Sequence, residues 1–297
     1  MAIPGNRAST DHPSQVSALP TVPITGEAFS PSSETALWWL TNAGFLINAH
    51  GTLIMIDPAI MLAPGASAVH ETGHRLLAPL PITASQVPRL DAVLYTHGDY
   101  DHFAPASARE LMRTGACFVG PPPVAAQLRE LGLPEARVRV ARAGETFAVG
   151  AVSVTPTPAD HPWQIRDPAK FGPPWGAEDC CGYLVGTPDG TIFHPGDTRL
   201  MDDHLRVGEV DVLLLDVSRN QYHLGVEGAT RLAEALGARH VIPHHYGSYD
   251  EPEMTAHNPY HGDPEEVRRG LHDAARRFHV LAPGQRFGLR HGSAEAR

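Results

Sequence analysis

The run His97-Gly98-Asp99-Tyr100-Asp101-His102 restricts the fold of this chain most, because it follows directly on an apolar segment at residues 90–95. A short apolar segment of this kind is typical of a buried strand. Four imidazole or carboxylate groups cannot all be core residues, since each polar group buried without a partner costs about 1 to 3 kcal/mol. In an extended chain alternate residues share one side, so His97, Asp99 and Asp101 can converge while His102 turns in as a helix begins. The run predicts a ligand cluster at the end of a strand.

Three further polar residues follow other predicted strands. His161 comes after the strand predicted at residues 152–156, Asp197 after the one at 191–194, and His245 after the one at 240–243, with His244 as its rival. A lone histidine is more often a hydrogen-bonded structural residue than a ligand. Four such strand ends in one chain, however, predict a metal site, because imidazole and carboxylate are common metal ligands.

Composition narrows the class of protein. The 297 residues, 42% of them hydrophobic, are enough for one large domain with an ample core. The formal net charge of -10 argues against broad contact with nucleic acid or an anionic membrane. Three cysteines are too few for a disulfide framework, and the chain shows neither a secretory signal nor an apolar membrane span, so we expect a cytoplasmic protein with no membrane partner.

The order of apolar segments indicates two similar halves. We expect a flexible arm at residues 1–33 and one domain at 34–297, which opens with strands at 36–40, 44–48 and 52–56. Helices are expected at 105–113, 123–131, 227–236 and 263–278, with the last strand within 284–289. Residues 58–87, with His70 and His74, and the tryptophan-containing stretch 162–179 read as long loops. Two β-rich halves, each followed by helices, predict an α/β (α+β) fold, a four-layered αββα sandwich.

The ligand pattern of this chain resembles that of the metallo-β-lactamase superfamily. It begins with His-x-Asp-x-Asp-His and continues along the chain with a His, a Gly-Asp and a late His. Within it, the chain is similar to the branch of L-ascorbate-6-phosphate lactonase and phospholipase-D-like hydrolases. The resemblance spans about residues 36–289 and rests on these segments: Leu37-Trp38-Trp39-Leu40 with Gly44, Ile56-Asp57-Pro58, Asp91-Ala92-Val93-Leu94, Gly182-Tyr183-Leu184, His194-Pro195-Gly196-Asp197-Thr198 and Val241-Ile242-Pro243-His244-His245.

The resemblance implies a site for two divalent metal ions, Zn, Mn or Fe. His97 and His161 would bind the first, Asp101, His102 and His245 the second, and Asp197 would bridge them, with Asp57 orienting a ligand. The His-Tyr-Gly run favours His245 over His244. Asp99 stands where the family usually has histidine. As a metal ligand it would favour Mn or Fe over Zn at the first ion, and it would lower the charge of the loaded site to about +1.

The activity implied is hydrolysis of a small-molecule ester, most closely a lactone or another cyclic ester. Asp101, Asp197 and Tyr246 are the expected catalytic residues, with Asp101 or Tyr246 delivering the proton. The residues that could contact substrate are Trp163, Arg166, Trp175, Tyr246 and His261, and the loop 162–179 is either a lid or an ordinary surface loop. Phosphodiester cleavage, iron-dependent redox chemistry and a non-catalytic metal-binding role are the alternatives, and homo-oligomer formation is compatible with the sequence.

Overall fold

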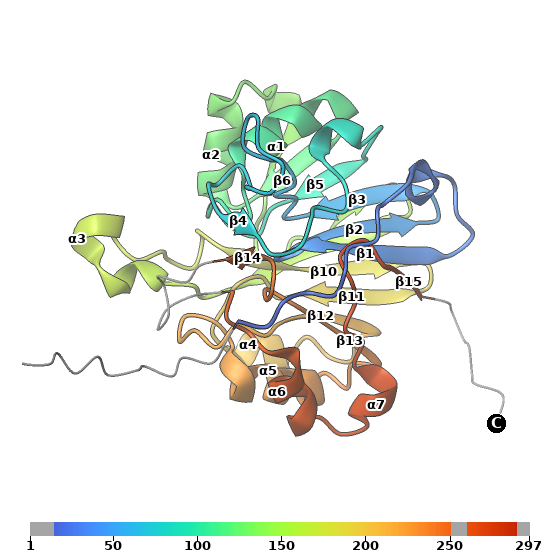
Figure 1. Cartoon of the computed structure of the whole chain (residues 1–297), viewed down its shortest axis with the longest axis vertical. Helices are drawn as coiled ribbons and strands as arrows, with labels where there is room; N and C mark the ends of the chain where they lie inside the picture. The colour runs from blue at the N-terminus through green and yellow to red at the C-terminus, as the bar shows by residue number, and fades with distance from the viewer. Residues whose placement is uncertain (1–14, 251–259, 290–297) are drawn as a thin grey trace, which may run out of the picture.

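Two β-sheets lie face to face in the middle of the computed structural model, which describes residues 15–250 and 260–289 (Figure 1). Two helices, α1 and α2, cover one sheet, and α4 to α7 cover the other (Figure 1). The α-helices are α1 (Pro105–Leu111), α2 (Pro122–Glu130), α3 (Pro168–Phe171), α4 (Asp202–Leu205), α5 (Gly225–Ala235), α6 (Pro264–Gly270) and α7 (Ala274–Arg277). This arrangement confirms the αββα sandwich predicted from the sequence.

The first sheet has seven strands and combines a meander with a parallel half. Strands β15, β1, β2 and β3 pair antiparallel, whereas β3, β5, β6 and β7 pair parallel. In spatial order the strands are β15 (Arg286–Leu289), β1 (Thr35–Thr41), β2 (Gly44–Ala49), β3 (Thr52–Ile56), β5 (Ala92–Leu94), β6 (Cys117–Gly120) and β7 (Val138–Val140).

The second sheet has six strands. They are, in spatial order, β13 (His240–His244), β12 (Val212–Asp216), β11 (Gly190–His194), β10 (Cys181–Thr187), β9 (Val152–Pro158) and β8 (Phe147–Val149). Strands β11 and β13 run parallel to β12, and β9 and β11 both run antiparallel to β10. The carboxyl ends of β9, β11, β12 and β13 therefore meet at one edge of this sheet.

Successive side chains along a central strand point to opposite faces of the sheet and so enter two different hydrophobic cores. In β1, Leu37 and Trp39 join the core between the sheets, whereas Trp38 and Leu40 join the core beneath α1 and α2. Both faces of the strand are buried, because each face of the sheet is covered. This burial on both sides explains why the sequence of β1 reads as an unbroken apolar run instead of an alternating one.

Shorter elements complete the domain. A two-stranded sheet pairs β4 (Arg75–Leu76) with β14 (Tyr249–Asp250), so the predicted loop 58–87 contains a strand. The 3-10 helices are η1 (Gly26–Phe29), η2 (Ala84–Gln86), η3 (Met112–Thr114), η4 (Glu135–Arg137) and η5 (Trp163–Arg166). Among the described residues, none of the helices has both the length and the apolar composition to cross a bilayer.

The closing helix predicted at residues 263–278 is wrong as a single element. Helix α6 ends at Gly270, Leu271 has extended backbone, and Asp273 takes a left-handed conformation before α7. Gly270 packs so closely on α5 that an added Cβ would lie 2.9 Å from Cγ2 of Thr230. Glycine weakens the helix at this point, and the chain turns so that Leu271 enters the core.

The described part of the predicted arm, residues 15–33, runs along the domain. Backbone N–H groups of Ala18, Val22 and Ile24 donate to the carbonyls of Gly247, Pro283 and Pro81 at 3.2, 2.8 and 2.9 Å. Residues 1–14 of that arm, and residues 251–259 and 290–297 of the predicted domain, lie outside the described residues.

Candidate metal centre

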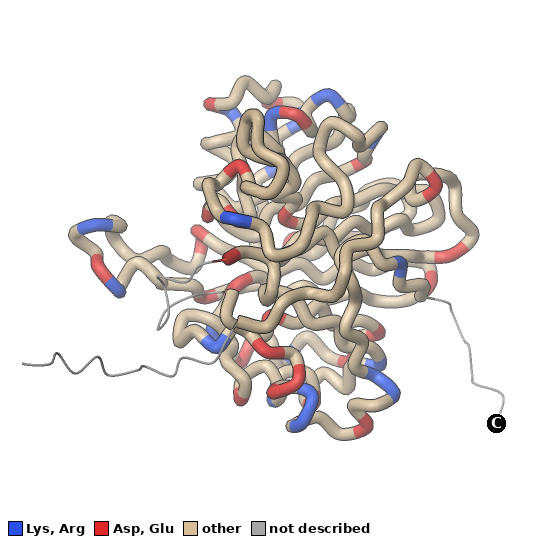
Figure 2. The backbone as a smooth tube through the Cα atoms, viewed as in Figure 1, with Lys and Arg blue, Asp and Glu red and all other residues tan. Residues whose placement is uncertain are grey.

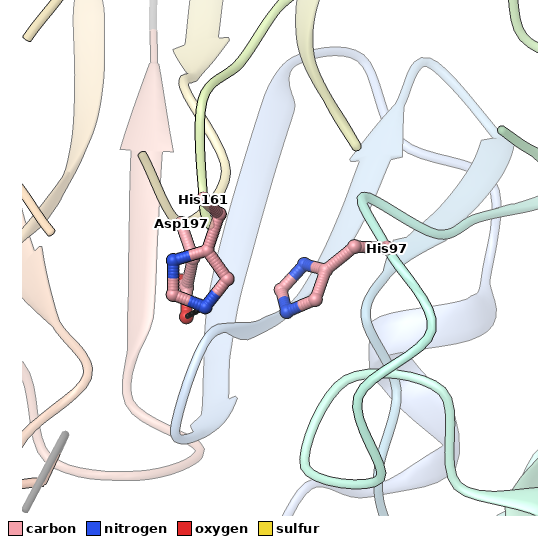
Figure 3. A group of neighbouring side chains, drawn as sticks. All are labelled: His97, His161 and Asp197. Atoms are coloured by element: carbon pink, nitrogen blue, oxygen red, sulfur yellow. Dashed lines mark ion pairs between the residues drawn. The ribbon is translucent and has the colours of Figure 1, made fainter. Parts of the chain in front are cut away.

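The predicted ligands come from loops at the ends of strands in both sheets. His97 follows β5, His161 follows β9, Asp197 follows β11 and His245 follows β13. Figure 3 shows His97 reaching toward His161 and Asp197 from the opposite side of the site. The backbone of Gly196 has a φ of +72°, and an added Cβ would lie 2.6 Å from the carbonyl oxygen of Cys181. The glycine before Asp197 therefore lets the backbone at this position lie close to that of Cys181.

A first group of ligand atoms comprises His97, His161 and Asp197, whose candidate atoms all lie within 4.8 Å of one another. The Asp99 carboxylate borders this group, with Oδ2 3.5 Å from Nε2 of His97 and 3.7 Å from Nε2 of His161. Nε2 of His97 and Oδ1 of Asp197 are buried without a hydrogen-bond partner in the described structure. Buried polar atoms without partners are costly, so this group is suited to a bound cation.

A second group comprises Asp101, His102 and His245. Oδ2 of Asp197 lies 3.2 Å from Nε2 of His102 and 3.1 Å from Nε2 of His245. Because it also lies 4.0 Å from Nε2 of His161, the Asp197 carboxylate stands between the two groups.

Hydrogen bonds on the outer side of the rings orient three of the histidines. His102 Nδ1 contacts Asp57 Oδ2 at 2.9 Å, and His161 Nδ1 lies 2.9 Å from the carbonyl oxygen of Tyr222. The Thr96 hydroxyl donates to Asp57 at 2.6 Å, so it accepts from Nδ1 of His97 at 2.9 Å. With the proton on Nδ1, each ring presents the lone pair of Nε2 to the cluster.

The charges of the cluster reinforce one another. Burial opposes ionisation of Asp197, but His102, His245 and His223 outweigh it and hold its pKa well below the ordinary value. Burial also opposes protonation of His245, yet Asp197 above all raises its pKa to about 9. A concentration of carboxylate charge thus attracts positive charge into the site, as a cation-binding centre requires.

A cavity of about 210 Å³ opens beside the cluster. Its walls include Asp99, Asp101, His161 and Asp197 from the cluster, and Trp163 and Arg166, two of the predicted substrate contacts. The remaining lining residues are His74, Tyr100, Asn220, Tyr222, His223 and Tyr260. The long loops predicted at 58–87 and 162–179 therefore both contribute to the wall.

The other predicted substrate contacts are not among the residues that line the cavity. Tyr246 is buried, stacks on Trp39 with ring centroids 5.2 Å apart and is not among the residues that line the cavity. Its geometry is that of a packing residue, which argues against the predicted role in catalysis. His261 forms an isolated bridge with Tyr246, and Trp175 lies edge-on to His97 with centroids 5.3 Å apart. His244 is buried between Phe45 and His194 and belongs to none of the three groups of candidate ligand atoms.

Sequence reasoning missed one histidine and one aspartate of the site. His223 lines the cavity, and its Nδ1 lies 2.6 Å from Oδ2 of Asp216 and 3.7 Å from Oδ2 of Asp197. Asp216 closes β12, so the strand-end rule that found the other ligands could have found it. His223 lies in the turn before α5, where local sequence gives no comparable signal.

Comparison with known proteins places this geometry in a family. Residues 52–246 match the sequence profile described as "Beta-lactamase superfamily domain". The chain belongs to the beta-lactamase superfamily. A relative named "UPF0173 metal-dependent hydrolase" from Rubrobacter xylanophilus is 30% identical over 263 residues, which cover 86% of this chain and 96% of the relative. A protein of the same name from Pyrobaculum arsenaticum is 29% identical over 251 residues, 83% and 96% of the two chains. The chain is therefore a member of this metal-dependent hydrolase family within the superfamily.

Solved structures agree on the fold. The metallo hydrolase Igni18 from Ignicoccus hospitalis has a TM-score of 0.65 at 21% identity, over 88% of this chain and 100% of that chain. An isothiocyanate hydrolase from Delia radicum gut bacteria has a TM-score of 0.65 at 18% identity, over 85% and 99%. At these identities the similarity concerns the superfamily fold and carries no substrate assignment.

Proposed function

We propose that this member of the superfamily holds two divalent metal ions and hydrolyses a small-molecule ester, most closely a lactone or related cyclic ester. The observation that carries the proposal is the position of Asp197 between two His/Asp groups at the wall of a cavity. His97, His161 and Asp99 would hold one ion, Asp101, His102 and His245 the other, and Asp197 both. Such ions supply an activated water at neutral pH and polarise the oxygen of the group under attack.

The chain's own residues would hold the reacting groups in place. Asn42 Nδ2 donates to Oδ2 of Asp101 at 3.1 Å and to its backbone carbonyl at 3.0 Å, which fixes the orientation of that carboxylate. Asp101 lines the cavity, so its carboxylate is placed to take the proton that the attacking water gives up and to pass it to the leaving alkoxide. Trp163 and Tyr222 supply apolar surface to the wall of the cavity.

Cavity size and charge support a small cyclic ester. The cavity volume of about 210 Å³ is smaller than the roughly 300 to 1,000 Å³ of typical ligand pockets, which favours a small substrate. With three aspartates in the site, two divalent ions leave a net charge of only about +1. A site with histidine at position 99 would carry one more positive charge and would attract an anionic phosphodiester more strongly. Phosphodiester cleavage is therefore the second candidate.

The test combines metal analysis with a substrate panel. We expect protein purified without chelator to carry two equivalents of Zn, Mn or Fe and to hydrolyse lactones faster than phosphodiesters or thioesters. Asp197→Ala should lose metal and activity, whereas Asp203→Asn, an exposed carboxylate on α4, should lose neither. Faster phosphodiester cleavage would reject the lactone, and oxygen consumption by an iron-loaded protein would reject hydrolysis.

A further inference from the structure

The turn between β1 and β2, residues 41–43, has an unusual backbone. Thr41 has a φ of +101° and Asn42 a φ of +46°. A positive φ is unfavourable for most residues other than glycine, and above all for a β-branched one such as threonine. Both residues are buried, and the Thr41 hydroxyl and the Asn42 amide oxygen have no hydrogen-bond partner in the described structure. Local costs of this kind persist where the surrounding structure holds the chain in place, and they are concentrated at functional sites.

Asn42 joins two candidate ligands that come from different sheets. Its amide Nδ2 donates to Oδ2 of Asp101 at 3.1 Å and to the Asp101 carbonyl at 3.0 Å. Its own carbonyl accepts the backbone N–H of His245 at 3.0 Å, and its backbone N–H donates to the Ser248 hydroxyl at 2.7 Å. Asp101 follows β5 of the first sheet and His245 follows β13 of the second. The turn therefore fixes the two ligands relative to each other.

The contact orients the Asp101 carboxylate without neutralising it. The ion pairs of Asp101 are with His102 and His245, each at 3.6 Å, and no lysine or arginine within residues 15–250 and 260–289 pairs with it. In Figure 2 the lysine and arginine positions are scattered among acidic ones over the visible helices and loops. A neutral amide donor holds a carboxylate in one orientation and leaves its negative charge available to a cation.

Different parts of the chain support the first ligand group. The Thr96 hydroxyl and the Tyr222 carbonyl accept from Nδ1 of His97 and His161. Neither His97 nor His161 forms a hydrogen bond with Asn42 in the part of the chain that the structure describes. Loss of the Asn42 side chain should therefore disturb the second group and leave the first one in place.

We propose that Asn42 is a positioning residue that makes the binding of the second ion, at Asp101, His102 and His245, depend on the turn between β1 and β2. This inference rests on the proposed function for the two ions, and it adds that one of them depends on this turn and the other does not. Asn42 acts through Asp101 and is not among the residues that line the cavity. Removal of a group that orients a metal ligand weakens metal binding by roughly 10- to 100-fold.

The test uses the full chain, stripped of metal and titrated with Zn²⁺ in competition with a chromophoric chelator. Asn42→Gly removes the amide and supplies a residue that accepts a φ of +46°. We expect roughly 10- to 100-fold weaker binding by the second group and unchanged binding by the first. Asn48→Gly is the matched control, because the buried Asn48 amide also donates two hydrogen bonds, to the carbonyls of Ala28 and Ser30 at 2.9 and 2.8 Å, near the other end of β2. It should bind both equivalents like the wild type.

Two ligand variants assign the equivalents to their groups. His161→Ala impairs the first group, so the equivalent that remains belongs to the second group, and addition of Asn42→Gly should weaken it. His102→Ala impairs the second group, and the equivalent that remains should not respond to Asn42→Gly. A merely structural role would weaken both equivalents alike. Equal weakening of both by Asn42→Gly, or weakening of neither, would overturn the proposal.

Ser248→Ala tests the same contact from its other side and replaces Asn42→Gly if that variant does not fold. The change removes the acceptor of the Asn42 backbone N–H, so it should weaken the same equivalent by a smaller factor, and unchanged affinity would overturn the proposal. A wild type that hydrolyses no ester would reject the proposed activity and leave the role of Asn42 standing, because the titration needs no substrate. A wild type that binds fewer than two equivalents would overturn both.

Discussion

Replacement of Asp57 by asparagine tests how much the metal centre depends on a residue that orients a candidate ligand without being a ligand itself. Asp57 is buried and accepts from the backbone N–H of Thr96 at 2.8 Å, from the Thr96 hydroxyl at 2.6 Å and from His102 Nδ1 at 2.9 Å. Burial opposes its ionisation, but His102, then His194 and His97, lower its pKa. The charged form therefore fits its surroundings.

Asparagine keeps the shape and one acceptor oxygen but offers an N–H₂ group where Asp57 had a second acceptor. That group must face a donor or force the His102 proton onto Nε2, which would then be unable to bind a metal. Loss of one charge-assisted hydrogen bond costs about 1.5 to 3 kcal/mol of stability. Loss of the orientation of a ligand weakens metal binding by roughly 10- to 100-fold.

Two assays measure these effects independently. Urea unfolding of the metal-free protein gives the stability, and competition with a chromophoric chelator gives the affinity of each metal equivalent. Asp91→Asn is the matched control. Asp91 lies just before β5 and, like Asp57, accepts a hydrogen bond from a backbone N–H group, that of Leu53 at 2.7 Å, but it orients no histidine. Its metal affinity should equal that of the wild type. If Asp57→Asn also binds both equivalents with wild-type affinity, Asp57 does not orient His102.

Three other changes test separate parts of the molecule. Burial lowers the pKa of His70 from 6.5 to about 4. As the pH falls, His70 therefore takes up its proton in the unfolded chain before it does so in the folded protein. The free energy of unfolding should then decrease by up to about 3 kcal/mol between pH 6.5 and pH 4. The urea midpoint of the wild type should therefore fall relative to that of His70→Gln as the pH is lowered through this range. Midpoints that change in parallel with pH in the two proteins would contradict the prediction. Asp99→His should keep the fold and retain or raise the zinc content per chain, since imidazole suits zinc; a folded variant with less zinc would oppose a ligand role for Asp99. In Gly247→Ala the new Cβ would lie 2.4 Å from the backbone nitrogen of Ala18, so we expect a loss of about 1 to 3 kcal/mol and faster proteolysis near Ala18; unchanged proteolysis would show that the arm does not depend on this contact.

The layered fold and the sites of the strand-end residues were predictable because both depend on local pattern. Short apolar segments bounded by turn residues mark the strands, and parallel strands bring their carboxyl ends to one edge. The break after Gly270 was missed although glycine weakens a helix, because the close packing of Gly270 on Thr230 of another helix cannot be read from the sequence. Strand β8 was missed for a similar reason, since it lies at the edge of its sheet and is only partly buried.

The same distinction explains why the family is easier to read from this sequence than the substrate. The candidate ligands follow the ends of strands in the two sheets, where the sandwich itself determines their positions. The cavity wall contains His74, Arg166 and His223, which come from loops or turns and carry no periodic pattern of their own. His223 reaches Asp216 across seven residues of chain only because the chain folds back before α5. Chemistry that depends on the sheets is thus readable from sequence, whereas selectivity that depends on loops needs the three-dimensional structure.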